Sequence, residues 1–397
     1  MSDDWSVPAM NAMEPTHTKR SDDLQMIVHR LNALAVKRLV SMFDPEKQLF
    51  CYKLKQTATG LVREGISPRY TAIALMGLHR LEQSGLTPPI EIKDVFDVLM
   101  ADTEWVDNIG DLGLLLWLCA LVAPDRLDEV DRRLDIKSAL TRFRDARQRR
   151  TMELSWFLSG LSHQGLACPE KLVGTRDLAV ETYRRIQRNQ GKEGIFGHLA
   201  STGGIAGMIR SDIGSFGDQV YPIYAMAKFS QAYEDEKATK KALDCAITLC
   251  EAQGSLGQWW WHYDSSNGRV AETFPVFSVH QHGMAPMAFF ALGDVIQSDF
   301  SPWICKGLQW IDDNELGIDM HDDSAEMVWS CIERTTPKRY WNAAMIMVTG
   351  REDRESSEGL RPLFESRPYE LGWLLYAFAP SATNRSDFFL NDKQSSR

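Results

Sequence analysis

The chain has 397 residues, of which 44% are hydrophobic and 25% charged, and its formal net charge at pH 7 is −10. This profile predicts a soluble globular protein with a sizeable core. The acidic balance argues against a general affinity for DNA or RNA, because phosphate binding needs clustered lysines and arginines.

The two ends of the chain differ from its body. Residues 1–21 are polar and lack the apolar core of a signal peptide, so we expect a disordered lead-in. Residues 381–397 predict a flexible tail, and residues 22–380, which contain no long linker, predict a single domain. No segment reaches the ~18 consecutive apolar residues of a transmembrane helix. The seven cysteines form no Cys-x-x-Cys pair, so we expect free thiols and a cytoplasmic protein.

The body of the chain reads as one helix after another. Amphipathic or charged segments alternate with segments that are apolar nearly all round. In chain order, the first kind comprises 24–43, 90–101, 126–147, 173–189, 237–252 and 301–312, and the second comprises 70–81, 111–122, 151–161, 219–233 and 281–293. Strand signals are scarce, and residues 270–279 are the best candidate.

This alternation is typical of helical hairpins packed in two layers, with the wholly apolar helices inside. Six or seven such hairpins could close into a ring or extend as an open solenoid. Solenoid repeats have a shorter and more regular period than this chain shows. The sequence therefore predicts an all-α fold, an (α/α)6–7 toroid of alternating inner and outer helices.

A short motif occurs twice where a predicted outer helix ends. Residues 190–196 read Gln-x-x-x-Gly-x-Phe, and residues 253–259 read Gln-x-x-x-Gly-x-Trp. The glycine allows a tight turn after the helix. The second copy resembles the QW motif of the terpenoid cyclase and protein prenyltransferase superfamily, and the first copy departs from it in Phe196. Similar turns occur in six-hairpin glycosidase-like rings, so the resemblance implies a toroid and leaves the chemistry open.

In such a ring the inner helices run parallel, so their N-termini gather at one end of the cavity. Free N–H groups and the helix dipole suit that end to anionic groups. The residues expected to open the inner helices are Arg69, Tyr70, Asp111, Arg150, Thr151, Glu153, Asp218, Gln219, Tyr221, His280, Gln281, His282, Asp322, Asp323, Glu326, Arg367, Tyr369 and Glu370.

Four of these residues are the candidate catalytic groups. Glu153 interrupts an apolar segment, and a buried carboxylate with a raised pKa suits general-acid work. Asp218 is either an N-cap or a second carboxylate at the cavity entrance. His280 and His282 would stay neutral at a helix start and could accept a proton. No spacing supports a metal site, and no cofactor is expected.

The densest aromatic and polar stretch follows the second copy of the motif. It comprises Trp259, Trp260, Trp261, His262, Tyr263 and Asp264. These residues either wedge a hairpin turn or line a pocket for a sugar or a hydrocarbon. Together with Tyr221, Gln281, Arg269 and Tyr369, they are the candidate substrate-binding residues.

These residue types point first to a carbohydrate-active enzyme on an oligosaccharide or polysaccharide, because glycosidic-bond chemistry uses paired carboxylates. The best pair for a hydrolase is Asp218 with Glu153 or Asp264, whereas a lyase or epimerase would use His or Tyr. The alternative is a terpene-cyclase-like enzyme on a prenyl diphosphate, since aromatic faces stabilise carbocations. Against it, the Asp-x-Asp-Asp motif of that family is absent, and residues 319–323 only approximate it. A non-enzymatic ring that binds a glycan or a protein is the third hypothesis.

Overall fold

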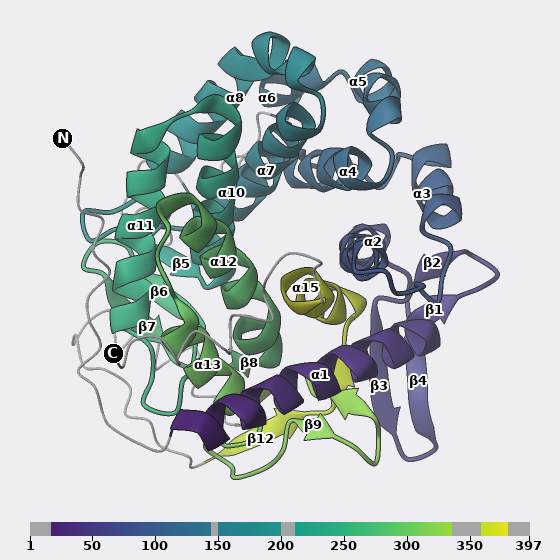
Figure 1. Ribbon diagram of the computed structural model, residues 1–397, viewed down its shortest axis with the longest axis vertical. Coiled ribbons are helices and arrows are strands. Elements are labelled where there is room, and N and C mark those ends of the chain that lie inside the picture. The colour runs from purple at the N-terminus through teal and green to yellow at the C-terminus, as the bar shows by residue number, and fades with distance from the viewer. Residues whose placement is uncertain (1–16, 144–149, 200–210, 336–358, 380–397) are drawn as a thin grey trace.

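The computed structural model describes residues 17–143, 150–199, 211–335 and 359–379. Within these ranges, six helices form an inner ring (Figure 1). They are α2 (Pro68–Gln83), α4 (Ile109–Val122), α7 (Thr151–Ala167), α10 (Gly217–Tyr233), α12 (Ala285–Ile296) with the preceding π-helical turn η5 (His280–Met284), and α15 (Pro368–Phe378). Each packs against the next, and α15 packs against α2. The predicted all-α toroid is confirmed, and the ring is closed.

The outer layer consists of helices that follow or precede the inner ones. These are α3 (Ile92–Ala101), α5 (Leu127–Leu134) with α6 (Ala139–Arg142), α8 (Leu172–Gln187), α11 (Glu236–Glu251), α13 (Ser301–Gln309) and α1 (His17–Met42). Short 3-10 turns lie beside them: η1 (Pro124–Arg126), η2 (Ile136–Ser138) and η4 (Pro169–Lys171). Helix α1 packs against α15, so the first described helix completes the last hairpin (Figure 1). The predicted domain boundary at residue 22 falls inside α1.

Helices α4 and α7 approach each other closely because glycines, which have no side chain, lie at their contact. Helix α4 is buried on every side, and α7 lies directly against it. A Cβ on Gly113 of α4 would lie 2.3 Å from the Phe157 amide nitrogen, and one on Gly160 of α7 would lie 2.4 Å from the Gly113 carbonyl oxygen. Since any side chain there would push the helices apart, these glycines allow the close approach of α4 and α7.

Aromatic side chains fill the middle of the ring. Trp117 of α4 stacks on His163 of α7 and on Tyr224 of α10, with ring centroids 5.1 and 4.7 Å apart. The Tyr224 hydroxyl lies 2.8 Å from His163 Nε2 and 2.7 Å from the Tyr376 hydroxyl of α15. Burial lowers the pKa of His163 well below its usual value, so this ring is neutral. At this level the toroid has a packed core.

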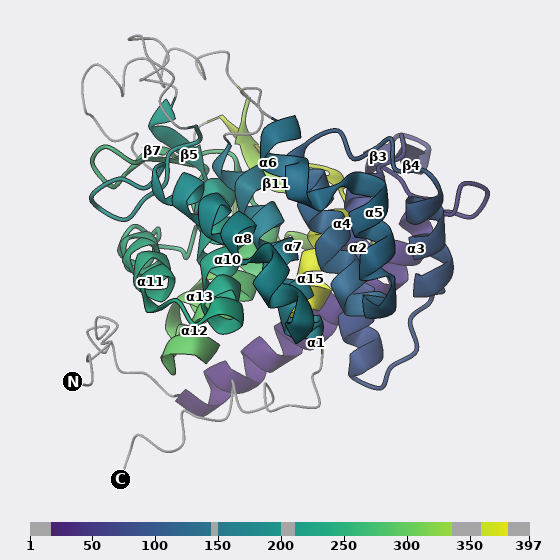
Figure 2. The ribbon, with the colours of Figure 1, turned by 90° about the horizontal axis from the view of Figure 1, so that it is seen from above.

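Short antiparallel strands surround one end of the ring. They are β1 (Phe43–Asp44), β2 (Leu49–Phe50), β3 (Lys53–Thr57), β4 (Gly60–Glu64), β5 (Ile213–Ser215), β6 (His262–Asp264), β7 (Arg269–Glu272), β8 (Val276–Phe277), β9 (His321–Asp322), β10 (Met327–Val328), β11 (Cys331–Arg334), β12 (Leu360–Leu363) and β13 (Glu365–Ser366). They form the sheets β1-β2, β9-β10, β12-β11-β8, β13-β3-β4 and β5-β6-β7. Several lead directly into inner helices, and Figure 2 shows β3, β4, β5 and β7 along one side of the ring. The sequence indicated only the β7–β8 region, because strands of two to five residues show no clear period.

The repeated motif forms the same turn twice. Gln190 Nε2 donates 2.9 Å hydrogen bonds to the glycine carbonyl of its own turn and to Lys241 O on α11. Gln253 Nε2 donates 3.0 Å bonds to the equivalent glycine carbonyl and to Trp303 O on α13. Each glutamine therefore ties the end of one outer helix to the next outer helix.

A second pair of glutamines, on the inner layer, fixes the aromatic residue that ends each motif. The Phe196 amide donates to Gln219 Oε1 of α10 at 2.8 Å. The Trp259 amide donates to Gln281 Oε1 of η5 at 3.3 Å. The two copies are thus structural repeats. In each copy, the glutamine of the motif bonds to the next outer helix, and a second glutamine, on the inner layer, bonds to the aromatic residue that ends the motif.

One predicted helix start is wrong. Asp322 ends β9, and Asp323 and Glu326 lie in the turn that leads to β10, so no inner helix begins there. Glu326 instead pairs with Arg38 of α1 at 2.8 Å and with Lys37. The acidic cluster therefore attaches a β-hairpin to the outer layer.

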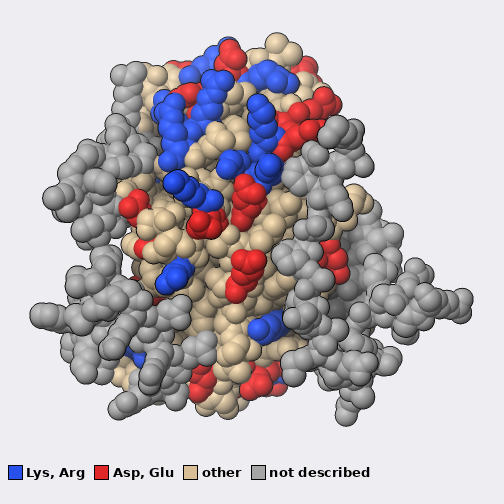
Figure 3. All heavy atoms as spheres, turned by 90° about the vertical axis from the view of Figure 1, so that its left-hand side faces the viewer, with Lys and Arg blue, Asp and Glu red and all other residues tan. Residues whose placement is uncertain are grey.

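The outer surface carries charges of both signs. Figure 3 shows lysines and arginines gathered on the upper part of the face that lies at the left of Figure 1. Outer helices α8 and α11 contain internal ion pairs, Arg185–Glu181 at 2.9 Å and Lys241–Asp244 at 3.6 Å. Exposed pairs of this kind contribute little to stability.

All seven cysteines are free thiols, as their spacing predicted. Across the described ranges, no helix combines the length and the hydropathy needed to cross a membrane. Residues 1–16 of the segment 1–21 that was predicted to be disordered lie outside the described residues, as does the predicted flexible tail at 381–397, whereas residues 17–21 form the first turn of α1.

Candidate functional site

The inner helices begin at one end of the ring, which we call the mouth. Three consecutive inner helices, α4, α7 and α10, each carry a carboxylate in the first turn: Asp111, Glu153 and Asp218. Each carboxylate lies beside a basic side chain.

Asp111 holds Arg69, which lies at the start of α2. Arg69 Nε donates to Asp111 Oδ1 at 2.5 Å, and Nη2 donates to Oδ2 at 2.9 Å. The carboxylate is 1% exposed and the arginine side chain 39%. Burial raises the pKa of Asp111 to about 6, and the guanidinium partly offsets this rise. Arg69 is thereby fixed at the mouth, 5.9 Å above the ring of Trp156.

Glu153 lies beside Arg150, the residue that precedes α7. Arg150 Nη1 is 3.3 Å from Glu153 Oε1, and their side chains are 40% and 9% exposed. Glu153 Oε2 is buried and has no hydrogen-bond partner among the described residues. Its Cγ packs against the start of α4, where a Cβ on Gly110 would lie 2.9 Å away. Burial, and then the charge of Asp218, raises the pKa of Glu153, as a general acid requires.

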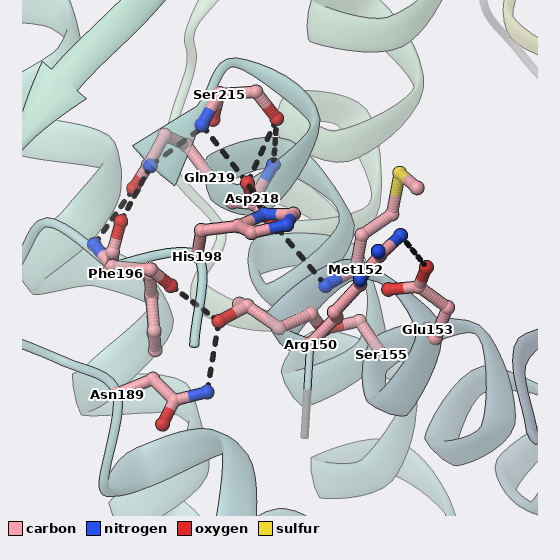
Figure 4. A network of polar contacts seen from close by, with 12 residues as sticks. Arg150, Met152, Glu153, Ser155, Asn189, Phe196, His198, Ser215, Asp218 and Gln219 are labelled. Carbon is pink, nitrogen blue, oxygen red and sulfur yellow. Dashed lines mark hydrogen bonds and ion pairs between the residues drawn. The ribbon is translucent and has the colours of Figure 1, made fainter. Parts of the chain in front are cut away.

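Asp218 is fully buried and holds His198 (Figure 4). Its carboxylate accepts hydrogen bonds from Met152 N at 3.2 Å, Ser215 N at 2.9 Å, Ser215 Oγ at 2.8 Å and His198 Nδ1 at 2.9 Å. The bond from His198 to Asp218 raises the pKa of the histidine, although burial opposes the rise. His198 is 34% exposed. Asp218 therefore has no free surface toward the mouth, and its partner His198 does.

The backbone around His198 is also anchored to α7. The Thr151 amide donates to His198 O at 3.0 Å, and Thr151 Oγ1 donates to Gly197 O at 2.5 Å. Asn189 Nδ2 in turn donates to Thr151 Oγ1 at 2.9 Å. Thr151, the first residue of α7, thus fixes the backbone of His198, and Asp218 of α10 orients its ring.

The three pairs follow one rule: the carboxylate is buried and the basic group is partly exposed. Arg69, Arg150 and His198 are each more than a third exposed, whereas their carboxylate partners are 9% exposed or less. The N-terminal ends of α4, α7 and α10 add partial positive charge at the same place. Although the whole chain is acidic, the mouth therefore presents basic groups to a ligand.

Aromatic rings line the α2 and α15 side of the mouth. Tyr52 is 44% exposed and stacks on Tyr70 with centroids 5.3 Å apart, and Tyr70 lies 4.6 Å from Tyr369. Deeper in the ring, Trp156 makes an edge contact with Tyr221 at 5.2 Å. Tyr221 and Tyr369, both predicted to bind substrate, thus lie among the inner aromatic rings, and Tyr52 extends the row to the surface.

The predicted histidines lie on η5, which packs directly against α15. His280 is 3% exposed and lies behind Trp261, Phe277 and Phe216, at centroid distances of 6.1, 5.1 and 4.4 Å. His282 is 1% exposed. Burial lowers the pKa of both histidines to about 3, so both are neutral, as expected. The structure does not place either ring beside Glu153 or Asp218, and their catalytic role remains a prediction that this burial does not favour.

The residues 259–264 are spread over three environments. Trp259 and Tyr263 are completely buried, and Trp260 is 4% exposed. Trp261 is partly exposed on the wall of the mouth. His262 Nδ1 lies 2.7 Å from Glu272 Oε2 on β7. Most of this stretch therefore wedges the hairpin turn, and only part of it is available to a ligand.

Three further predicted site residues lie away from the three carboxylate pairs. Asp264 caps the β6–β7 turn by accepting hydrogen bonds from Ser266 and Asn267. Gln281 is buried and bonded to the turn at Trp259. Arg269 is exposed on β7. Asp264 consequently does not form a carboxylate pair with Asp218.

A metal site does not emerge from the described residues, because no group of three histidine, cysteine, aspartate or glutamate side chains there could hold an ion. What the mouth offers instead is a buried acid, partly exposed basic groups and aromatic rings.

Solved structures match the chain over nearly its full length. An unsaturated glucuronyl hydrolase specific for heparin has a TM-score of 0.54 at 17% identity, covering 91% of this chain and 97% of its own. An unsaturated glucuronyl hydrolase from Streptococcus agalactiae has a TM-score of 0.55 at 9% identity, with coverages of 94% and 97%. A possible member of the GH105 family from Salmonella enterica has a TM-score of 0.56 at 12% identity, with coverages of 97% and 99%. No family model matches the chain, and no curated protein does.

The chain has the fold of the six-hairpin glycosidase-like toroids. At these identities the likeness concerns the fold alone.

Sequence reasoning missed His198, the basic group that Asp218 orients. The histidine follows the first copy of the repeated motif as an isolated polar residue, and no local pattern marks it. Arg69 and Asp111 were expected to open inner helices, but their pairing depends on the contact between α2 and α4. Arg150 and Glu153, in contrast, pair locally at the start of α7.

Proposed function

We propose that the chain is a carbohydrate-active enzyme that acts on an acidic oligosaccharide bound at the mouth. The observation that carries the proposal is the set of partly exposed basic groups, Arg69, Arg150 and His198, each backed by a buried carboxylate. Arginine recognises planar anions such as carboxylate and sulfate through charge-assisted hydrogen bonds. The neighbouring tyrosine row supplies faces on which sugar rings stack.

The matched structures support this class of substrate. Two are named unsaturated glucuronyl hydrolases. A variant of the Streptococcus agalactiae enzyme, with a TM-score of 0.55 and 10% identity to this chain, is described in complex with dGlcA-GalNAc6S. A uronate or sulfate group on a sugar is what the basic mouth would bind.

Each residue then has a role in the proposed reaction. Glu153 is the general acid, because burial keeps its proton on at a pH where an exposed glutamate has lost it. Arg150 and Arg69 bind the anionic group. Asp218 is a positioning residue, which acts by orienting His198 toward the substrate.

The first experiment incubates the purified protein with acidic and neutral oligosaccharides and reads the products by mass spectrometry. We expect turnover of uronate- or sulfate-bearing substrates only. Glu153→Gln should lower kcat by about 10²–10⁴-fold, the usual contribution of a general acid. Asp177→Asn, an exposed carboxylate on α8, is the matched control and should be unchanged.

Binding is tested separately from chemistry. Arg150→Ala should raise KM for the acidic substrate about tenfold or more, because a hydrogen bond to a charged group is lost. Equal turnover of neutral and acidic substrates, or full activity of Glu153→Gln, would contradict the proposal.

A prenyl diphosphate in the same assay tests the terpene-cyclase-like alternative. A cyclase needs a deep apolar chamber, and in the described residues the middle of the ring is filled by Trp117, His163 and Tyr224. No product is therefore expected from that substrate. For location we retain the proposal of a cytoplasmic protein, which seven free thiols support.

A further inference from the structure

A separate cavity of about 550 Å³ lies outside the mouth, between the C-terminal end of α11 and strand β7. Its polar lining includes Glu251, Gln253, Arg269, Glu272 and Thr273, and Trp260 forms part of its wall. This volume is in the range in which proteins hold small molecules, ~300–1,000 Å³. None of the roles proposed for the mouth uses it.

The backbone of β7 forms one side of this cavity. β7 is the edge strand of the sheet β5-β6-β7, and residues 268–273 line the cavity one after another. Since side chains alternate along a strand, consecutive lining residues mean that the strand edge itself faces the space. The edge offers hydrogen-bonding groups in addition to the side chains. Thr273, which is 7% exposed, has a hydroxyl without a partner in the described part of the chain.

A row of polar side chains connects this cavity with the mouth. In the sheet register, Ser215 of β5 pairs with His262 of β6, which pairs with Glu272 of β7. Paired residues lie on the same face of a sheet, so the three side chains form a line across it. Ser215 bonds Asp218 at the mouth, and Glu272 lines the cavity. Two strand spacings, roughly 10 Å, separate the ends of this row.

We propose that the cavity is a distal subsite for an uncharged sugar unit of the same oligosaccharide whose acidic unit occupies the mouth. The inference rests on the proposed function. It adds that acidic and uncharged sugar units alternate along the substrate. The carboxylates of Glu251 and Glu272 accept hydrogen bonds from sugar hydroxyls, and Arg269 donates them. Two carboxylates beside one guanidinium would repel a second uronate, which is why the distal unit is uncharged.

The test compares a uronic acid–N-acetylhexosamine disaccharide with the alternating tetrasaccharide. The double variant Glu251→Gln/Arg269→Ala removes polar groups of the cavity, and Ala271→Trp fills it. Each should raise KM for the tetrasaccharide about tenfold, the equivalent of one or two lost hydrogen bonds, and change KM for the disaccharide by less than about twofold. Lys240→Ala, at an exposed residue about three turns before Glu251 on α11, is the control and should change neither KM.

A second arm does not depend on catalysis. Saturation-transfer NMR with the neutral disaccharide lactose should show contact with the wild-type protein, reduced in Ala271→Trp and retained in Arg150→Ala. If lactose contact is lost only in Arg150→Ala, or if tetrasaccharide and disaccharide KM values rise together in the cavity variants, the distal subsite is refuted. If no acidic oligosaccharide is turned over while lactose contact still depends on Ala271, the proposed function fails and the cavity remains a sugar site.

Discussion

At the scale of single residues, the mouth is built from pairs in which the acidic side chain is buried and the basic side chain is partly exposed. Asp111, Glu153 and Asp218 are buried, and the basic groups beside them reach solvent. A buried carboxylate is costly unless it is bonded, and the three are bonded to very different degrees. Asp218 accepts four hydrogen bonds, whereas Glu153 has one oxygen without a partner in the described part of the chain. The least satisfied carboxylate is the one to which we assign chemistry.

Glu153→Gln should therefore increase stability at alkaline pH. The folded-state pKa of Glu153 is raised, so the wild-type protein loses stability as the pH rises through that pKa, and the glutamine variant does not. We expect the variant to gain up to about 1–2 kcal/mol at pH 8 and to lose this advantage near pH 4. Urea unfolding of both proteins at the two pH values measures the difference. A variant that is the less stable protein at pH 8 would show that Glu153 is stabilised rather than strained.

Asp218→Asn should lower the pKa of His198. The hydrogen bond from His198 to this carboxylate is the largest cause of the raised pKa, and it loses its charge in the variant. The pair stabilises the fold below the unfolded-state pKa of histidine, and this contribution is lost as the pH rises through the raised folded-state pKa. The destabilisation by Asp218→Asn, on the order of 1–3 kcal/mol, should thus be larger at pH 6 than at pH 9. An NMR titration of the His198 ring that is identical in both proteins would refute the positioning role.

At the scale of elements, the toroid depends on the two repeated turns. The glutamines of the two turns bond to the next outer helices, α11 and α13 respectively. The glycine of each turn adopts a positive φ, +85° at Gly194 and +97° at Gly257. The turn thus joins three elements: the outer helix that it ends, the next outer helix and the inner helix that follows.

Gly257→Ala should destabilise the protein by more than about 2 kcal/mol, because its φ is strained for alanine and the new Cβ would lie 2.0 Å from the Lys306 carbonyl oxygen. Gly174→Ala on α8 is the matched control, since no atom lies within 4 Å of its Cβ position. There the replacement should stabilise by up to about 1 kcal/mol. Thermal melts of the two variants should move in opposite directions, and a common direction would count against the turn's importance.

The sequence predicted the elements better than their contacts. All-round apolar segments such as 111–122 identified the inner helices, because burial on every side leaves a direct mark on composition. The strands left almost no mark, and β9–β10, which contains Asp322, was mistaken for the start of an inner helix. The aromatic run at 259–264 was visible, but whether Trp259 faces a ligand or the core depends on packing that lies far away in the sequence. His198 became apparent only when two inner helices were placed side by side.

At the scale of the whole molecule, the ring is held closed by contacts between its two ends. Helix α1 packs on α15, and α15 packs on α2. Glu365 adds a polar contact across the closure, because it accepts a hydrogen bond from Lys53 at 2.8 Å. Stability is therefore expected to be shared around the ring rather than confined to one hairpin.

Leu39→Ala on α1 tests this expectation. Leu39 is fully buried, so its truncation should cost about 2–5 kcal/mol. Its neighbour Val40 is 50% exposed, and Val40→Ala should cost less than about 0.5 kcal/mol. In the Leu39 variant, the near-ultraviolet signal of the central tryptophans and the helical signal should be lost in a single transition. Early melting of α1 alone, with the tryptophan signal intact, would show that the ring is stable without its last hairpin.

The pairing of α1 with α15 also constrains the order of events during translation. The ribosome releases α1 first, and the surface that this helix needs is not complete until residue 378 has been made. Until α13, β10 and α15 have been made, α1, with its buried residues Leu31 and Leu39, lacks its native contacts with these elements. The last hairpin can assemble only after α15 has been synthesised, and in the meantime α1 is a segment that a holdase would recognise.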